Sequence, residues 1–442
     1  MKQKTTAPAA PDNAPATERP RIWDHPIGFW FIFWGELAER ASFYGVQAIL
    51  ALYLNERLGF SESDASGVVA YFNAAVYILP LLGGYLADHY FGKYRTIVAF
   101  SLPYIVGQFL LGIESLSVLY VALALLAMGS GVIKPNISPL MGMTYDQKRP
   151  GQVQLRAHAF AMFYFSINVG ATISTFGVPE ISQRLDYSTA FMFPAALMVF
   201  ALGFFALGKR FYAVETISRA PVTPEHRRQQ WQTLKRILGL FIVVSFFWTV
   251  FYQSPSTWTF FAKNYLDLNF LGWEMGPAQV QAFNPLLILV LIPVMSVVWR
   301  VLARAGWDLR PTDRMLVGFV LTLFTSVIMT IAGYVASPTE KISVLWELVA
   351  YFLITVAEIC ISVEGLKLAF TGAPDAMKSF VTGCWLGAVF LGNMLNTQIV
   401  RLYEDVLSPG PYFALLAVMM VPVTLVFLWV AQRFNRVDAG QV

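Results

Sequence analysis

The stretch GELAERASFYG, residues 35–45, places two carboxylates and a guanidinium inside an almost wholly apolar segment. Glu36, Glu39 and Arg40 are spaced i, i+3 and i+4, so a helix would put all three on one face. One arginine compensates one carboxylate, and the second acid is then surplus and gains proton affinity from its neighbour. The pattern predicts a proton carrier. The alternative is a structural ion pair that fixes one packing, but a charge that costs roughly 2.5–3.5 kcal/mol at the bilayer centre is usually functional.

Further charges interrupt other apolar segments. Lys134 could satisfy Glu36 or Glu358 when no ligand is bound, and a Lys134–Glu358 bridge could close one membrane side until a ligand competes for it. Glu364 and Lys367 are spaced for an i, i+3 pair, with a proton relay as the competing interpretation.

Composition indicates a polytopic helical membrane protein. The chain is 57% hydrophobic and 13% charged, against about 25% charged in soluble domains, and its apolar runs reach spanning length. Cys360 and Cys384 lie in apolar segments and predict neither a disulfide nor a metal site. We find no nucleophile motif, no metal cluster and no GxxxxGK[ST] stretch, so we expect no enzyme, no ATP-driven pump and no cofactor. A channel stays open as an alternative, which a conductance test would separate.

Hydrophobic patterning predicts an all-α protein with twelve spans. They are expected at 27–54, 65–87, 96–113, 117–143, 156–179, 189–209, 236–262, 277–299, 314–335, 344–371, 377–400 and 411–432. We expect a disordered tail at 1–26, two six-helix bundles at 27–209 and 236–434, a polar linker at 210–235 between them, and a second tail at 435–442.

Charge asymmetry predicts the orientation. Most of the 31 Lys and Arg residues lie in segments on the side of the termini, and only Arg57, Arg184, Lys263, Lys341 and Arg401 lie in loops on the other. The positive-inside rule therefore places both termini in the cytoplasm, and because the basic residues sort by membrane side we expect no nucleic-acid partner. This six-plus-six layout resembles the major facilitator fold, in which the substrate site lies at mid-membrane between the halves.

The segment GGYLADHYFGKYR, residues 83–95, is similar to the cytoplasmic signature of that superfamily. There an acid caps a neighbouring helix and a glycine permits a tight turn. Asp88 and Arg95 are therefore predicted to act in gating.

Five stretches together resemble the proton-dependent oligopeptide transporter family. GELAERASFYG resembles its E-x-x-E-R-F-x-Y-Y-G motif, GSGVIKPNISPL (129–140) its K-P-N motif, and FYFSINVGA (163–171) its F-Y-x-x-I-N-x-G signature. FNPLL (283–287) matches its asparagine-proline, and AEICISVEGL (357–366) with TGCWLG (382–387) resembles its G-E-L…S-P-x-G-L…M-G-x-W pattern. The order is conserved along nearly the whole membrane portion of the chain.

The resemblance implies a proton-coupled importer of di- and tripeptides that works by alternating access. Arg40 and Lys134 would bind the peptide carboxylate, and Glu358 would bind its ammonium with help from Asn168 and Asn284. The remaining implied roles are proton coupling by Glu36, Glu39 and Glu358, with H⁺ as the coupling ion; peptide contacts from Tyr44, Tyr77 and Ser362; and pocket walls from Trp385, Trp258 and Phe163.

The departures from the family pattern concern the outer gate. Many bacterial members carry arginine at the position of Gln47 and glutamate at that of Tyr252, which form an outer ion pair; here both are neutral. We expect a Gln47–Tyr252 hydrogen bond there, or no contact. Ser362-Val363 replaces Ser-Pro. His25, His89, His158 and His226 lie outside the spans or near a span start, so a buried histidine switch is not expected.

The runner-up solute is nitrate or a conjugated metabolite on the same scaffold. The acid pair of the opening motif favours peptides. We expect a monomer in the lipid bilayer of a bacterial inner membrane.

Overall fold

In the computed structural model, the described residues are 21–215, 224–371 and 378–438. They form twelve long helices, and each overlaps one of the twelve predicted spans, which confirms the all-α prediction. The helices are α1 Ile27–Glu56, α2 Glu62–Leu86, α3 Lys93–Leu111, α4 Leu116–Lys148, α5 Val153–Arg184, α6 Tyr187–Leu207, α7 Pro224–Phe251, α9 Phe283–Arg304, α10 Pro311–Val335, α11 Leu345–Thr371, α12 Lys378–Ile399 and α13 Pro409–Asp438.

Ten helical segments of the described residues are long and apolar enough to cross a membrane. α1, with its three central charges, is not one of the ten. Its charges are nevertheless buried, because neighbouring helices surround that face. Lipid therefore meets the apolar sides of the other helices, and α1 lies inside the bundle.

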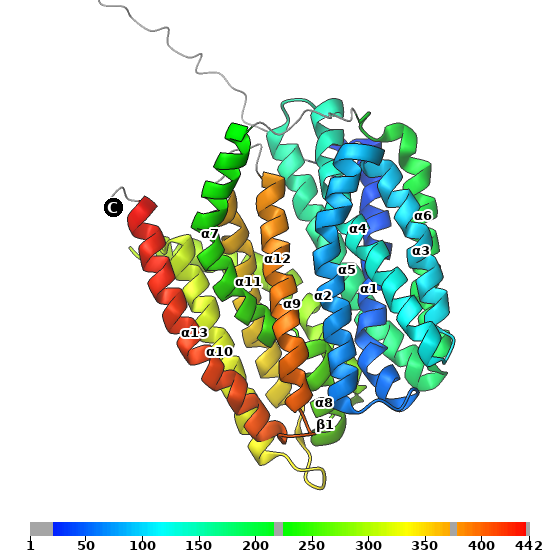
Figure 1. The fold of residues 1–442 in the computed structure, drawn as a ribbon, viewed down its shortest axis with the longest axis vertical. Coiled ribbons are helices and arrows are strands. Elements are labelled where there is room, and N and C mark those ends of the chain that lie inside the picture. Colours follow the sequence, from blue (N-terminus) through cyan, green and yellow to red (C-terminus); the bar gives the residue numbers. More distant parts are fainter. Residues whose placement is uncertain (1–20, 216–223, 372–377, 439–442) are drawn as a thin grey trace, which may run out of the picture.

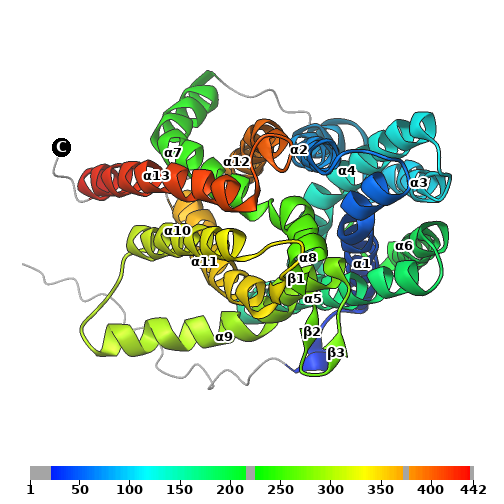
Figure 2. The same cartoon turned by 90° about the horizontal axis from the view of Figure 1, so that it is seen from below.

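The helices pack in two groups (Figures 1 and 2). α1 packs on α5 and α6, and α4 packs on α2 and α3. In the second group α10 packs on α11 and α13, while α12 packs on α7. α2 with α12 and α5 with α9 join the groups, and the site between them is lined from α1, α2 and α5 on one side and from α7, α9 and α11 on the other.

The seventh predicted span is broken. α7 ends at Phe251, a π-turn η4 follows at Ser254–Trp258, and a short α8 spans Thr259–Tyr265. Pro255 lacks an N–H and cannot continue the ladder of α-helical hydrogen bonds, which explains the break. The start of the eighth predicted span is likewise a 3₁₀ turn, η5 at Pro277–Ala282. Both irregular turns lie beside the central cavity described below.

We call the side with the start of α1 and the end of α13 the terminus side, and the opposite side the far side (Figure 1). The far side carries four two-residue strands. β1 Leu266–Asp267 pairs in parallel with β4 Ile342–Ser343, and β2 Asn269–Phe270 pairs antiparallel with β3 Trp273–Glu274.

Parts of two segments that were predicted to be a linker and a disordered tail form helical turns in the structure. α7 begins at Pro224, so the later part of the predicted 210–235 linker is helical. The predicted tail 1–26 ends in a 3₁₀ turn, η1 Ile22–Asp24, and in His25, which is buried. Residues 1–20, 216–223 and 439–442 lie outside the described residues, and the division into two bundles stays a prediction.

Candidate functional site

The charged cluster of α1 is enclosed by protein. Glu36, Glu39 and Arg40 are 5%, 2% and 2% exposed. Arg40 Nε lies 3.3 Å from Glu36 Oε1 and also contacts the Glu39 carboxylate, so the three side chains do share one helix face. Glu36 Oε2, Glu39 Oε1 and Arg40 Nη2 accept or donate no hydrogen bond among the described residues. One guanidinium therefore serves two buried acids and saturates neither.

Lys134 adds a second buried cation from α4. Its Nζ lies 4.1 Å from the centroid of the Tyr77 ring, a cation–π contact. Within the described part of the chain Lys134 forms no ion pair, and the anticipated Lys134–Glu358 bridge is not formed in this conformation. The ammonium lies on an aromatic face and interacts at longer range with Glu36 and Glu39, an arrangement that a ligand carboxylate could outcompete.

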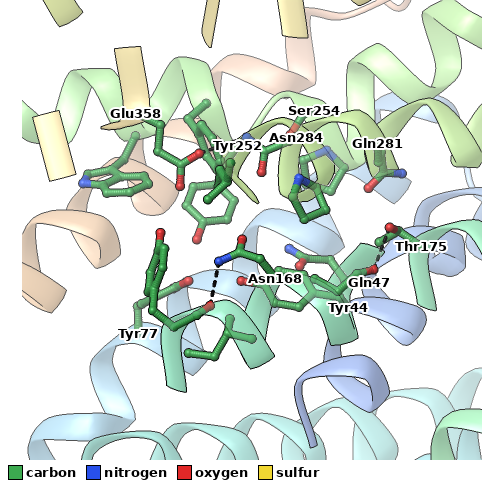
Figure 3. A pocket seen from close by; sticks show the side chains of 18 residues that line it. Tyr44, Gln47, Tyr77, Asn168, Thr175, Tyr252, Ser254, Gln281, Asn284 and Glu358 are labelled. Carbon is green, nitrogen blue, oxygen red and sulfur yellow. Dashed lines mark hydrogen bonds between the residues drawn. The ribbon is translucent and has the colours of Figure 1, made fainter. Parts of the chain in front are cut away.

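A central cavity of about 160 Å³ lies between the two helix groups (Figure 3). One water needs roughly 10–15 Å³ of such space, so the cavity has room for a small solute. Figure 3 shows Glu358, Tyr252 and Asn284 along one side, facing Asn168, Tyr44 and Tyr77 on the other. Both helix groups therefore contribute polar atoms to one space.

Glu358 is the one carboxylate among the described residues that line this cavity. The Asn284 amide donates to Glu358 Oε2 at 2.9 Å and to Thr355 Oγ1 at 3.1 Å. This contact fixes one carboxylate oxygen and leaves the rest of the group able to accept a hydrogen bond from a ligand cation.

The predicted site residues divide between the wall and its surroundings. Those in the cavity wall are Tyr44, Gln47, Tyr77, Asn168, Tyr252, Asn284 and Glu358. Those outside it are Glu36, Glu39, Arg40, Lys134, Ser362 and Trp385. Arg40 lies one helical turn before Tyr44, and Lys134 lies over the wall residue Tyr77, so both cations stand just behind the wall.

Ser362 and Trp385 lie in a second layer. The Ser362 hydroxyl is buried without a hydrogen bond in the described residues. The ring of Trp385 packs edge-on against Trp248, 6.4 Å between centroids, and Trp248 itself lines the cavity. Trp385 thus supports the wall from behind in this conformation.

Of the two alternatives expected for Gln47 and Tyr252, this conformation agrees with the second, in which no hydrogen bond joins them. Gln47 Nε2 instead donates to Asn73 Oδ1 at 3.0 Å, within its own helix group. Tyr252 packs edge-on against Tyr77, 5.8 Å between centroids. The buried Gln47 amide is satisfied within its own helix group, so the contact across the cavity at this position is made by Tyr77 and Tyr252.

Several wall residues were missed from the sequence: Tyr164, Thr175, Trp248, Ser254 and Gln281. Tyr164 stands inside the quoted motif FYFSINVGA, and Trp248 lies four residues before Tyr252 on the same helix face, so both could have been indicated. Ser254 and Gln281 belong to η4 and η5, and their position follows from irregular turns that apolar patterning does not predict.

On the terminus side, Gly92 has a left-handed backbone, φ 76°, between η2 Ala87–Phe91 and α3. The acid that caps α3 is Glu215. Its Oε2 and Oε1 accept from Lys93 N at 2.6 Å and Tyr94 N at 2.9 Å. Asp88 pairs with Lys93 Nζ at 2.6 Å. Arg95 is exposed, and a gating role for Asp88 and Arg95 stays a prediction.

Glu364 pairs with Arg314 of α10 at 2.6 Å. Sequence spacing did not predict this partner. The side chain of Lys367, the anticipated partner, lies outside the described residues. The structural interpretation of Glu364 gains support from this pair.

A histidine pair was also unexpected. His25 is 4% exposed, its Nε2 lies 3.0 Å from His158 Nδ1, and its Nδ1 hydrogen-bonds the Tyr145 hydroxyl. Burial, and then the neighbouring His158, lower the pKa of His25 to about 4. The pair ties the segment before α1 to α4 and α5 in the neutral form.

A membrane-embedded bundle with buried charges around a central polar cavity defines a membrane transporter. Residues 94–229 and 217–415 match the POT family, and the chain belongs to that family. The fold prediction is confirmed as well, because solved POT transporters of the major facilitator fold share it.

Curated relatives carry transporter names. Peptide transporter family 1 of Drosophila melanogaster is 33% identical over 372 residues, 72% of this chain and 50% of that protein. Dipeptide and tripeptide permease B of Xenorhabdus bovienii is 26% identical over 95% of this chain and 98% of its own length. The chain thus spans half of the insect relative and nearly all of the bacterial one. The expectation that it is not an enzyme is confirmed.

Solved structures agree over nearly the whole chain. The crystal structure of an auto-inhibited POT family peptide transporter is 25% identical with a TM-score of 0.85, covering 92% of this chain. The POT family transporter PepTSo is 27% identical with a TM-score of 0.84, covering 93%.

The buried histidine predicts a pH-dependent stability. The unfolded chain accepts a proton on His25 below about pH 6.5, whereas the folded protein resists it down to about pH 4. Stability is therefore expected to fall as pH drops through this window. Between pH 7 and pH 4.5, the melting temperature of His25→Gln should fall less than that of the wild type. The measurement is made on detergent-solubilised protein.

His89→Gln is the matched control, because His89 bonds only the Tyr85 carbonyl on the same side. Between pH 7 and pH 4.5, the melting temperature of this control should fall as much as that of the wild type. Equal losses for all three proteins would contradict a buried neutral His25.

Proposed function

We propose that this protein is a proton-coupled symporter that imports di- and tripeptides by alternating access. Membership of the POT family and the names of its relatives support peptide transport. The observation that carries the proposal is the charge layout: Glu358 on the wall from α11, with Arg40 and Lys134 just behind the opposite wall. Peptides of any sequence share an ammonium at one end and a carboxylate at the other, which this layout complements.

In the proposed binding mode the peptide carboxylate lies toward Lys134 and Arg40. The guanidinium offers a planar fork and the ammonium a point charge. The ammonium of the peptide lies toward Glu358, assisted by the Asn168 and Asn284 amide oxygens. Tyr44 and Tyr77 hydrogen-bond the peptide backbone from the same wall. Aromatic walls between the charged ends tolerate different side chains.

Proton coupling would arise from charge imbalance. Arg40 cannot lose its proton and is shared by two acids, while Lys134 acts on them only at longer range without an ion pair among the described residues, so two ionised acids are incompletely compensated in a dry environment. A proton on Glu36 or Glu39 removes that cost. A peptide carboxylate that approaches Arg40 competes with Glu36 and Glu39 for the guanidinium and favours their protonation. Binding of the peptide and binding of the proton are thereby coupled.

For the orientation we infer that the terminus side is cytoplasmic, since the basic residues concentrate there. The protein then belongs in the inner membrane of a bacterium, as a monomer with bundles 27–209 and 236–434. The bacterial permease relative, matched over 98% of its length, supports this placement.

The conformation is then closed to the outside. Among the described residues, every hydrogen bond and ion pair between α1–α6 and α7–α13 lies from the cavity toward the far side. Asn264 donates to Glu62 at 2.7 Å, Lys263 pairs with Glu56 at 2.8 Å and Ser63 donates to Asp405. Further contacts are Lys263–Asn55, Arg401–Tyr71, Gln279–Phe176, Gln279–Glu180 and Gln281–Ala48. We call this set the far-side belt.

The far-side belt replaces, in this proposal, the central outer ion pair that Gln47 and Tyr252 cannot form. Its individual contacts are partly exposed; the Lys263 and Glu56 side chains are 29% and 37% exposed. Such a pair contributes about 0.5–1 kcal/mol, so the outer gate is held by several weak contacts and opens readily.

Uptake into proteoliposomes tests the function. Labelled dialanine should accumulate under an inward proton gradient and stop accumulating when the gradient is collapsed. Unlabelled dialanine and trialanine should compete, while alanine and tetraalanine should not, because only the shorter peptides bring both charged ends to the walls. Gradient-driven uptake of nitrate or a conjugated metabolite with no dialanine uptake would contradict the peptide proposal.

Removing Lys263 tests the far-side belt. In a variant with Cys360 and Cys384 changed to Ser and the cavity residue Ser254 changed to Cys, Lys263→Met should open the outer side more often. Labelling of intact cells by a membrane-impermeant maleimide should rise about two- to fivefold, the equivalent of about 0.5–1 kcal/mol.

Lys341→Met is the control, since the Lys341 ammonium bonds the Lys263 carbonyl within the same helix group. Equal labelling in the two variants would show that the Lys263 contacts do not hold the outer side closed.

A further inference from the structure

One face of α11 carries a column of polar side chains that ends at the cavity. Glu347, Tyr351, Thr355 and Glu358 follow one another at intervals of four, four and three residues, which places them on the same side of the helix. With a rise of 1.5 Å per residue, the column runs for about 16 Å from the far-side end of α11 to the cavity wall.

Glu347, the outermost member, is buried without a partner. Its side chain belongs to a residue that is 1% exposed, and neither carboxylate oxygen accepts a hydrogen bond among the described residues. It lies in the first turn of α11, where free backbone N–H groups could have capped it, but none donates to it. A helix-capping role therefore does not explain this acid.

The charged and titratable groups on the neighbouring elements are engaged elsewhere. On α8, Lys263 pairs with Glu56 and the Tyr265 hydroxyl donates to Glu404. On β1, Asp267 accepts from the Asn269 N–H. α10 carries Tyr334 at this end, which is 64% exposed. Lys341 precedes β4 and bonds the Lys263 carbonyl.

That leaves Tyr351, one turn further along α11, as the titratable group beside Glu347. An ionised carboxylate without a donor or a counter-charge costs several kcal/mol when it is buried. The neutral acid avoids this cost. Burial in the conformation with a closed far side therefore favours the protonated form of Glu347. Opening the far side to water would relieve the same cost.

The rest of the column leads to the site. The Tyr351 hydroxyl is buried and lies near Ser254 of the cavity wall. Thr355 Oγ1 accepts from the Asn284 amide, which also donates to Glu358. Trp258 packs edge-on against Tyr351, 5.1 Å between centroids, and this contact keeps the Tyr351 ring in the column.

We propose that Glu347 is a further proton-binding residue, loaded from far-side water, and that it supplies the coupling proton to Glu358. An O–H bond forms at Glu347 when that side is open. The proton then leaves through the Tyr351 hydroxyl and cavity water, each taking one proton and giving one up, until an O–H bond forms at Glu358. The inference rests on the proposed proton-coupled transport.

Glu347→Gln tests it, because the amide matches the shape of the neutral acid and keeps the fold. Two quantities are compared in proteoliposomes: gradient-driven dialanine uptake and dialanine counterflow without a gradient. The counterflow rate of the variant should stay within about twofold of the wild-type rate, whereas its gradient-driven uptake should fall at least fivefold. Glu340→Gln, which removes an exposed acid on the same side, should change neither.

Infrared spectroscopy gives a readout that needs no substrate. At pH 7.5 the carbonyl stretch of a protonated carboxyl should be present in the wild type and in Glu340→Gln, and weaker in Glu347→Gln. An unchanged band or an unchanged ratio of driven uptake to counterflow would overturn the proposal. A wild type without any dialanine uptake would instead overturn the proposed transport function, while the infrared band would still report on Glu347.

Discussion

The cost of a charge away from water is the constraint on which the rest of this structure depends. Glu36, Glu39 and Arg40 are buried together on α1, and no arrangement of three such groups is neutral unless one acid holds a proton. The bundle encloses the charged face of α1, a helix that is not among the ten apolar enough to cross a membrane by composition. The site, its polarity and its proposed proton dependence follow from that placement.

The same constraint links the two helix groups. Cations stand behind the wall built by the first helix group, and the wall carboxylate Glu358 comes from the second group. A zwitterionic ligand would bridge the groups and substitute for the contacts that each charge lacks. Outside the cavity, weak polar contacts of the far-side belt hold the groups together. Transport in this account is an exchange of partners among charges that are never all satisfied by the protein alone.

Local patterns were predictable and distant contacts were not. The spacing of Glu36, Glu39 and Arg40 depends only on helix geometry, and the apolar runs predicted twelve helices because spans of this length have few other structures. Ser254 and Gln281 reach the cavity through the π-turn and the 3₁₀ turn, whose effect on direction is not encoded in hydropathy. Glu215 caps a helix more than a hundred residues earlier in the chain, and His25 meets His158, which follows it by 133 residues. Such pairs arise from tertiary packing.

In the proposed mechanism, the surplus acid of the α1 cluster couples peptide movement to protons. The most direct measurement compares counterflow of dialanine with gradient-driven accumulation in proteoliposomes for Glu36→Gln, Glu39→Gln and the wild type. The account predicts that at least one variant retains counterflow and loses accumulation, because a permanently neutral side chain lets the loaded carrier exchange but cannot release a proton. Accumulation at wild-type level in both variants would contradict the claim and assign coupling to residues outside α1.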